Sequence, residues 1–505
     1  MHTIQIPLCT TKYDEQIMEK RFHALSHIHN VLVKHAKKLL KKLKYDIRYQ
    51  RLLSEYIILK KKENLSCTDK ACKTQLSMEM KTIRLEMGLS EYGMQSYIKV
   101  CGKRYAKCLS SQQVQKEATR VWKGVEKVLF GEGKDIHFKR YMDFDTIGGT
   151  SNKNGAKFLK DTFSIHWIGL DIRCKYPKRE DEIDYLTESL GADISYCEIK
   201  REIFPNGWHY YALVCLKGDA PKKMRSVGNG VMGIDPGTST IAGVSDTAVV
   251  LEELAPDNQK YNKKIVRLQR QMDTSKRLSN SGKYLSDGTI NKKNRDRWKF
   301  SKTYFKKRRM LKSLYRKKTA YIKQSHERQI KRLLTDSVHF IVEEMSYKAL
   351  QKKGKKTTRQ DKTSTIPQKD GTVKLVHKYK KKKRFGRSLN NRAPARFLTI
   401  LERKALLYGG SFQTIETKEY RASQYEHDTD SYHKIPLKQR TKEIDGHMVQ
   451  RDLYSAFLIK NTDKDFQHPD REKCICEFQN FVTMQDELIK DMKQQHISMR
   501  TCFGF

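Results

Sequence analysis

Apolar residues recur in the N-terminal part of the chain at the spacing of an amphipathic helix. They lie three or four residues apart and form one stripe, which consists of Leu25, Ile28, Leu32, Ala36, Leu39 and Leu43. A short strand is expected before this stripe, at residues 2–9, and helical character continues with breaks to about residue 130. The pattern therefore predicts an α-helical domain at residues 11–130, inserted after a first strand at residues 1–10.

A pattern of strands follows from about residue 135 to residue 217. Its clearest part is CEIKREIFPNGWHYYALVCLKG, in which Asn206-Gly207 separates two β-rich runs. Asn and Gly tolerate the positive φ of a hairpin turn, so this dipeptide predicts a hairpin. We interpret residues 131–225 as a small β-barrel or open sheet, which the strand at residues 2–9 can join.

Strands and helices alternate after Val231. VMGID is typical of a buried strand and PGTST of a turn, while IAGVSD and TAVVLEEL indicate two further strands, which is how an RNase H-like sheet begins. Further elements are expected as helices around 256–273 and 294–334, the strand VHFIVEE, a helix at 393–409, the strand SFQTIE and a helix at 451–460. This alternation favours an α/β layer. The predicted fold class is therefore multidomain α+β, with an RNase H-like (RuvC-type) α/β core at residues 226–410.

Composition and charge add a partner to this picture. The chain has 505 residues, which favours two to four domains, and 102 Lys and Arg against 58 Asp and Glu give a net charge of +44. Such a charge attracts polyanions, with nucleic acid as the leading partner and a membrane surface as the weaker alternative. A hydrophobic fraction of 37% indicates folded domains rather than a disordered basic tail.

Several sequence features indicate a cytoplasmic location. The sequence contains no run of about 18 apolar residues, so no transmembrane helix is expected. A membrane is not among the expected partners. The N-terminal MHTIQIPLCTTKYDEQ lacks the basic and apolar regions of a signal peptide. The 11 cysteines are scattered without regular pairing, which suits reduced thiols in a cytosol.

Two segments are unusually basic. Residues 291–332 contain 18 Lys and Arg against 2 acids and are expected to form a helix with a basic face, whereas residues 351–392 contain 16 against 2 and indicate a flexible insertion. Each run can be a solvated face, but both flank the acidic strands considered next, which favours phosphate contact. The candidates for nucleic-acid contact are Lys292, Arg295, Arg297, Lys306, Lys307, Arg308, Arg309 and Arg316.

Three acidic positions stand at the ends of predicted elements in the C-terminal part. Asp235 ends the strand VMGID, where it either caps the following turn or binds a cation. Glu343 and Glu344 follow VHFIV, and because neighbouring strand residues point to opposite faces, only one of them can face Asp235. Asp452 begins a helix, where a carboxylate also complements the helix dipole. Together they form the ordered acidic set that two-metal phosphodiester cleavage with Mg²⁺ requires.

These segments resemble the TnpB family of insertion-sequence proteins, which is related to compact type V CRISPR effectors. The resemblance covers residues 225–461 and is carried by GIDPGTSTIAGVSD, LQRQMD, NRDRWKF, HFIVEEM, LERKALLYGGSFQTIE and VQRDLYSAFLI. It implies that Asp235, Glu343 and Asp452 are the catalytic, metal-binding carboxylates of a RuvC nuclease core. Glu343 is preferred to Glu344 because the family places an acid, then a polar residue, then an aliphatic residue.

The resemblance also implies an activity and names for the domains. Family members are RNA-guided DNA endonucleases that use two Mg²⁺ ions, for which Mn²⁺ can substitute, and that bind a guide RNA and target DNA beside a short motif. Residues 1–10 and 131–225 then correspond to the wedge β-barrel and residues 11–130 to the recognition domain. Residues 451–461 correspond to the final helix of the RuvC core. Residues 462–505 are expected to be a polar, weakly helical tail, and a monomer is favoured.

One departure from the family concerns zinc. The family commonly carries a four-cysteine zinc ribbon between its second and third carboxylates, but residues 411–450 contain no cysteine, so zinc is not expected. Two alternatives to a guided nuclease stay open. One is a nuclease-inactive, RNA-guided repressor, and the other is a guide-independent resolvase or transposase.

Overall fold

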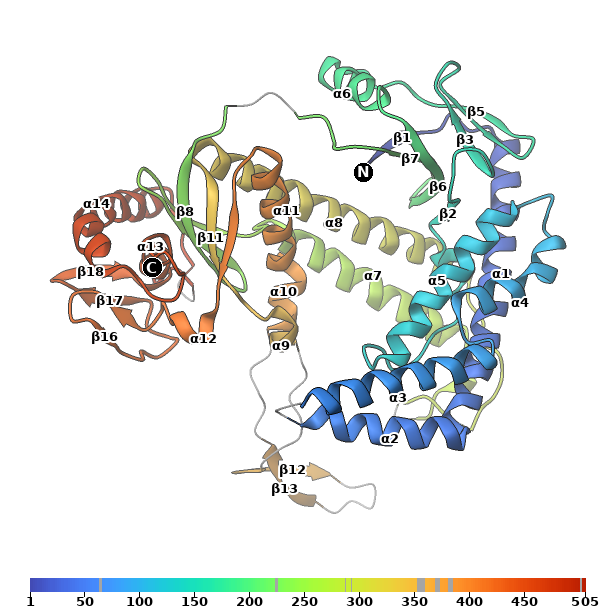
Figure 1. The fold of residues 1–505 in the computed structure, drawn as a ribbon, viewed down its shortest axis with the longest axis horizontal. Helices are drawn as coiled ribbons and strands as arrows, with labels where there is room; N and C mark the ends of the chain where they lie inside the picture. The colour runs from blue at the N-terminus through green and yellow to red at the C-terminus, as the bar shows by residue number, and fades with distance from the viewer. Residues whose placement is uncertain are drawn as a thin grey trace. The chain divides into compact units, whose positions relative to one another are not determined.

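The structure, a computed structural model, describes residues 1–62, 66–222, 226–286, 288–291, 293–351, 359–367, 373–379, 385–499 and 502–505 (Figure 1). These residues form a mixed α+β protein with several separate sheets, as the sequence predicts. The chain divides into two compact units, Met1–Lys223 and Met224–Phe505. Among the residues covered, no helix combines the length and the apolar character that crossing a bilayer demands.

In the described part of unit 1, five helices follow the first strand and precede the other strands. They are α1 (Lys12–Tyr45), α2 (Ile47–Lys61), α3 (Cys67–Glu86), α4 (Glu91–Lys103) and α5 (Ser111–Leu129). Helix α1 begins at a capping box in which Thr11 and Asp14 satisfy each other's backbone N–H groups. All six residues of the predicted apolar stripe are buried in α1, so this prediction is confirmed.

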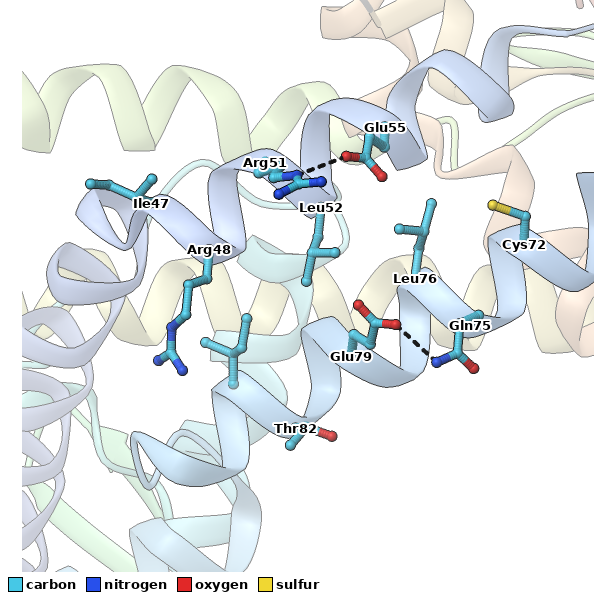
Figure 2. Close-up of a pocket in the computed structure, with 11 residues that line it drawn as sticks. Ile47, Arg48, Arg51, Leu52, Glu55, Cys72, Gln75, Leu76, Glu79 and Thr82 are labelled. Atoms are coloured by element: carbon cyan, nitrogen blue, oxygen red, sulfur yellow. Dashed lines mark hydrogen bonds and ion pairs between the residues drawn. The ribbon is translucent and has the colours of Figure 1, made fainter.

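A groove of about 760 Å³ runs between α2 and α3 (Figure 2). Leu52 and Leu76 line it, and each helix carries its own polar pair beside it. Arg51 Nε donates to Glu55 at 3.2 Å on α2, and Gln75 Nε2 donates to Glu79 at 2.8 Å on α3. None of the predicted site residues lines this groove.

Two sheets complete unit 1. One has the order β1-β7-β6-β2 and the other the order β3-β4-β5. Their strands are β1 (His2–Pro7), β2 (Thr146–Gly148), β3 (Ala156–Leu159), β4 (Ser164–Trp167), β5 (Asp171–Arg173), β6 (Ile194–Phe204) and β7 (Gly207–Leu216). The first strand pairs with β7, as expected, and helix α6 (Glu180–Leu190) was not predicted.

The β6–β7 hairpin is confirmed, but its turn lies one residue earlier than predicted. Phe204 pairs with Gly207, so Pro205 and Asn206 form the turn. Proline pre-sets φ for the first turn position. Gly207, at φ +145°, then begins the second strand in a conformation that L side chains rarely adopt.

Unit 2 is built on a five-stranded sheet with the order β10-β9-β8-β11-β14. Its strands are β8 (Gly230–Pro236), β9 (Thr240–Val244), β10 (Val249–Glu253), β11 (Ser337–Glu343) and β14 (Phe412–Ile415). The first three strands along the chain are antiparallel, whereas β11 runs parallel to β8 and β14 runs parallel to β11. All five strands were predicted.

The two faces of this sheet are covered by different helices. Met232 and Phe340 share an apolar core with residues of α8 (Lys302–Asp336) and α11 (Pro394–Leu407). Ala242 and Val244 share another core with α13 (Arg451–Lys460) and α14 (Arg471–Gln494). Successive strand residues point to opposite faces, so β9 contributes Ile241 to the first core and Ala242 to the second.

The predicted start of one helix in unit 2 is wrong, and the predicted tail holds a long, packed helix. Helix α7 (Asn258–Leu278) lies near its expected place, but α8 begins at Lys302, because Ser301 caps it and residues 293–300 are not helical. The side chain of Asn280 bonds both the N–H and the C=O of Lys299 at 2.7 Å, which holds this segment outside the helix. The predicted tail contains α14, which buries a stripe made of Cys474, Phe478, Phe481, Val482, Gln485 and Met492.

The remaining elements of unit 2 are short. They are η2 (Ser281–Lys283), α9 (Tyr347–Gln351), β12 (Arg359–Pro367), β13 (Val373–Tyr379), α10 (Gly386–Arg392), α12 (Thr417–Tyr420), β15 (Tyr425–Glu426), β16 (Ser431–Tyr432), β17 (Thr441–Ile444) and β18 (His447–Gln450). Of the basic insertion predicted at 351–392, residues 352–358, 368–372 and 380–384 lie outside the described residues. Its other parts form the β12–β13 hairpin and α10.

Candidate carboxylate site

Asp235 and Glu343 lie at the ends of two neighbouring parallel strands. Val342 of β11 is in register with Ile234 of β8, so the next residue of each strand is one of the two acids. Ile234 and Val342 belong to the core under α8 and α11. By alternation, Asp235 and Glu343 therefore point to the opposite face, which α13 covers. Glu344 is exposed, which favours Glu343 as the partner of Asp235.

Asp452 reaches the same place from the first turn of α13. The close approach of this helix to β8 depends on Gly233, two residues before Asp235. A Cβ atom at Gly233 would lie 2.3 Å from the carbonyl oxygen of Ala456 and 2.3 Å from the backbone nitrogen of Lys460. Because glycine has no Cβ, the backbone of α13 can rest directly on the strand.

The start of α13 is held by the C-terminal segment. The Gln450 side chain caps the helix by accepting from Leu453 N at 2.7 Å. The Gln450 backbone N–H donates to Gln485 of α14 at 2.7 Å, and its Nε2 donates to the carbonyl of Cys502 at 3.3 Å. Gln485 is completely buried. Residues far along the chain therefore fix the position of Asp452.

The three carboxylates influence each other's protonation. Burial raises the pKa of Asp235 well above its usual value, and the charges of Glu343 and Asp452 raise it further. Burial raises the pKa of Glu343 to about 7. Burial also raises the pKa of Asp452, against the opposing charges of Arg440 and Arg451. Negative charge at this site is thus poorly compensated by the protein, which is the condition that favours a bound cation.

The donor chemistry of the site fits Mg²⁺, which prefers carboxylate oxygen ligands and retains several waters. The side chains are not yet converged: within the residues covered, no three Asp, Glu, His or Cys side chains form a group able to hold a metal ion. Arg440 Nη1 instead donates to both oxygens of Asp452, at 3.2 and 3.4 Å. Binding a cation here therefore requires side-chain rotation, with Arg440 competing for Asp452.

The raised pKa of Glu343, about 7, predicts a pH-dependent response to Mg²⁺. The folded carboxyl keeps its proton longer than the unfolded one, so between about pH 4.5 and 7 the metal-free protein loses stability as pH rises. A divalent cation offsets this loss. We expect millimolar Mg²⁺ to raise Tm by a few degrees more at pH 8 than at pH 6 in differential scanning fluorimetry, and the difference to shrink in Asp235→Asn. Equal gains at both pH values would contradict the assignment.

The predicted nucleic-acid contacts lie on and before α8. Arg295 and Arg297 are exposed in the segment before the helix, and Lys292 lies outside the described residues. Lys306 and Arg309 are exposed on α8, whereas Lys307, Arg308 and Arg316 are half-buried. Because consecutive helical residues are turned by about 100°, positions 306–309 surround the helix instead of forming one basic face.

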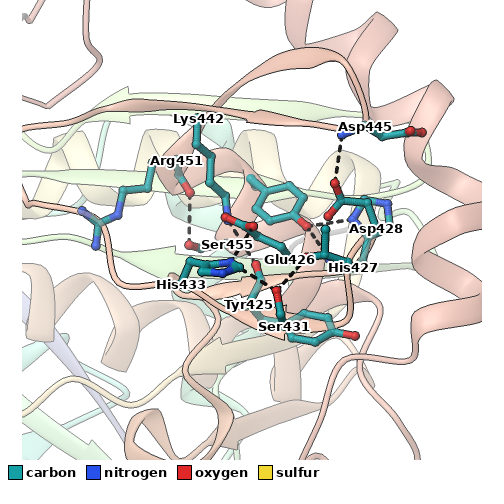
Figure 3. A network of polar contacts seen from close by, with 12 residues as sticks. Tyr425, Glu426, His427, Asp428, Ser431, His433, Lys442, Asp445, Arg451 and Ser455 are labelled. Carbon is teal, nitrogen blue, oxygen red and sulfur yellow. Dashed lines mark hydrogen bonds and ion pairs between the residues drawn. The ribbon is translucent and has the colours of Figure 1, made fainter.

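The segment at residues 411–450 is organised by a polar network (Figure 3). His427 Nδ1 is 2.7 Å from the hydroxyl of Tyr454, and burial lowers the pKa of this histidine. His433 Nδ1 lies 2.9 Å from Glu426 Oε2. Lys442, with 5% of its side chain exposed, donates to the Tyr425 carbonyl at 3.1 Å and pairs with Glu426 at 3.8 Å. His427 and His433 of this segment thus have protein partners.

Several residues of the site were not identified from the sequence. They are Gly233, which admits α13, and Arg440 and Arg451, which oppose the raised pKa of Asp452. Tyr347 also lies here: its hydroxyl donates to the Pro236 carbonyl at 3.5 Å, and burial, together with the charge of Asp235, raises its pKa. No spacing in the sequence marks these residues, because each acts through a contact with a distant segment.

No family model matches the chain, and no curated protein matches it. A chain of the cryo-EM structure of the Cas12f1-sgRNA-target DNA complex is 11% identical, with a TM-score of 0.43, over 91% of this chain and 98% of that chain. A chain of the cryo-EM structure of a CRISPR-Cas12f ternary complex is 12% identical, with a TM-score of 0.26, over 91% and 99%. TM-scores below 0.5 do not establish a shared fold, so the residues of this chain carry the functional proposal.

Proposed function

We propose that this protein is a Mg²⁺-dependent, RNA-guided DNA endonuclease of the TnpB and compact type V kind. The observation that carries the proposal is the placement of Asp235, Glu343 and Asp452 at one edge of the unit 2 sheet, where burial raises the pKa of all three. Two neighbouring strands and one helix on the same face supply them. A net charge of +44 supports a polyanionic substrate.

The sheet supports the same proposal. Three antiparallel strands followed by two parallel ones are the arrangement expected of an RNase H-like core. In this reading Asp235 and Glu343 are held rigidly by paired strands, and Asp452 is held by a capped helix. When bound, Mg²⁺ would activate water and stabilise the leaving oxygen of a phosphodiester. Arg440 holds Asp452 in the absence of metal.

The test is to sequence the RNA that co-purifies with the full chain and then to replace its guide region. We expect cleavage of DNA matching the new guide in Mg²⁺ and none in EDTA. Cleavage that ignores the guide would favour a resolvase or transposase. The absence of both co-purifying RNA and cleavage would overturn the proposal. The expected cytoplasmic location and monomeric state stay predictions.

The ion pair between Arg440 and Asp452 favours one second candidate, a nuclease-inactive guided repressor. If Arg440 stayed paired with Asp452 permanently, it would keep a metal ion from this carboxylate. Guide RNA and target DNA would then still bind, but the DNA would not be cleaved. A repressor would bind guide-matched DNA without nicking it in either Mg²⁺ or Mn²⁺. Nicking in either metal excludes this candidate.

A further inference from the structure

A cavity of about 800 Å³ lies between α7 and α10 within unit 2. The α7 residues that line it follow helical spacing and form one face: Gln259, Asn262, Lys263 and Val266. The α10 residues are Arg387, Ser388, Asn391 and Arg392, and Ser239 joins them from the turn after β8. The buried Asn258 side chain donates to the carbonyl of Asn391, which ties the two helices together.

A buried lysine forms part of this site's support. Lys318 of α8 is 6% exposed, and its Nζ donates to Asn262 Oδ1 at 3.1 Å and to Asn391 Oδ1 at 2.9 Å. Because both amide oxygens face the lysine, both NH₂ groups are turned away from it. In the part of the chain described, these NH₂ groups have no protein acceptor and Lys318 has no carboxylate partner. The site therefore offers the amide N–H donors of Asn262 and Asn391, held in place by the positive charge of Lys318.

The walls add further positive charge. Lys263 and Arg387 are exposed cations, and none of the lining residues is acidic. Arg392 is already engaged, because it pairs with Glu253 and donates to the Ala255 carbonyl at 3.0 Å. Among the described residues that line the cavity none is aromatic, so they offer no platform on which a base would stack.

We propose that this cavity binds phosphodiester groups of the DNA strand that enters the carboxylate site. Amide, guanidinium and ammonium donors without acids or aromatics recognise a nucleic-acid backbone instead of its bases. Ser239 follows Asp235 by four residues, which span at most about 14 Å, so the cavity begins within a few nucleotides of the carboxylates. The assignment of the bound nucleic acid as the DNA strand to be cleaved rests on the proposed function. The recognition of phosphodiester groups by the cavity does not depend on it.

The first test uses the full chain, stripped of RNA at high salt, with single-stranded dT20 in EDTA. We compare wild type with the double variant Lys263→Gln/Arg387→Gln across a salt titration. Each phosphate contact removed lowers the slope of log Kd against log salt by about 0.7, so the double variant should lose about 1.4. The matched control is Lys464→Gln/Lys490→Gln, two exposed lysines near and on α14, which removes the same charge and should leave the slope unchanged.

An unchanged slope in Lys263→Gln/Arg387→Gln, or an equal loss in the control, would overturn the site. This measurement needs neither guide nor metal, so it stands even if guided cleavage is never observed. A second measurement decides which strand binds. Guide RNA affinity should be unchanged in the double variant while the KM for DNA cleavage rises. A loss of guide affinity instead would overturn the assignment to DNA.

Discussion

Replacement of Asp235 by asparagine is expected to abolish DNA cleavage while guide RNA and target DNA still bind. Asparagine keeps the shape of the side chain but removes the charge that a divalent cation requires. We expect single-turnover cleavage in Mg²⁺ to fall by at least about a thousandfold, equivalent to about 4 kcal/mol of transition-state stabilisation. Binding, measured by gel shift, should change little, because an aspartate makes no attractive contact with a phosphate.

The acid pair at the end of β11 supplies a matched control. The Glu343→Gln variant should lose cleavage activity as the Asp235→Asn variant does. Glu344 is the next residue and is exposed, so the Glu344→Gln variant should retain cleavage activity. The metal-free Asp235→Asn protein should also melt at a higher temperature at pH 8, because burial and two neighbouring acids oppose charge at this position. Wild-type cleavage by Asp235→Asn, or loss of guide RNA by it, would sink the assignment.

Substitution of Gly233 by alanine should strongly destabilise unit 2. The added methyl group would meet two backbone atoms of α13 at 2.3 Å, and a helix backbone cannot give way as a side chain can. We expect a loss of about 3 kcal/mol in the free energy of unfolding, or about 5–10 °C in Tm by calorimetry. Cleavage should fall as well, because displacement of α13 carries Asp452 away from the strands.

Gly282→Ala is the control for this experiment. A Cβ atom at Gly282 meets nothing within 4 Å, so the same chemical change should alter Tm by less than about 1 °C. A Gly233→Ala protein as stable as wild type would show that α13 does not rest on β8 as described.

The order of elements in unit 2 was accessible from the sequence because its strands are short, apolar and bounded by turn residues. VMGID and VHFIV are found as strands, and the helix at residues 451–460 ends where its apolar pattern ends. The acids at their ends could be singled out because a basic chain rarely places a carboxylate after a buried run of apolar residues. That Asp235 and Glu343 lie side by side could not be predicted, because it depends on the register of β8 with β11.

Other features were missed because local pattern and tertiary contact disagree. The stripe of α14 has a glutamine, Gln485, among its apolar residues, which makes the segment look polar although that glutamine is fully buried and bonded. The residues before α8 have a helical pattern, yet Asn280 binds the Lys299 backbone, and the helix begins only at Lys302. The role of Gly233 appears only when a helix more than 200 residues later lies against it.

The dependence of Gln450 on Gln485 and Cys502 has a consequence for biosynthesis. A nascent chain that has reached about residue 470 already contains all three carboxylates, but it lacks the helix that completes the core around Tyr454 and Phe457. Such a chain cannot yet hold Asp452 in place. The proposed nuclease activity would therefore be withheld until residue 502 has been synthesised, and messages truncated between the codons for residues 470 and 502 would yield proteins that do not cut.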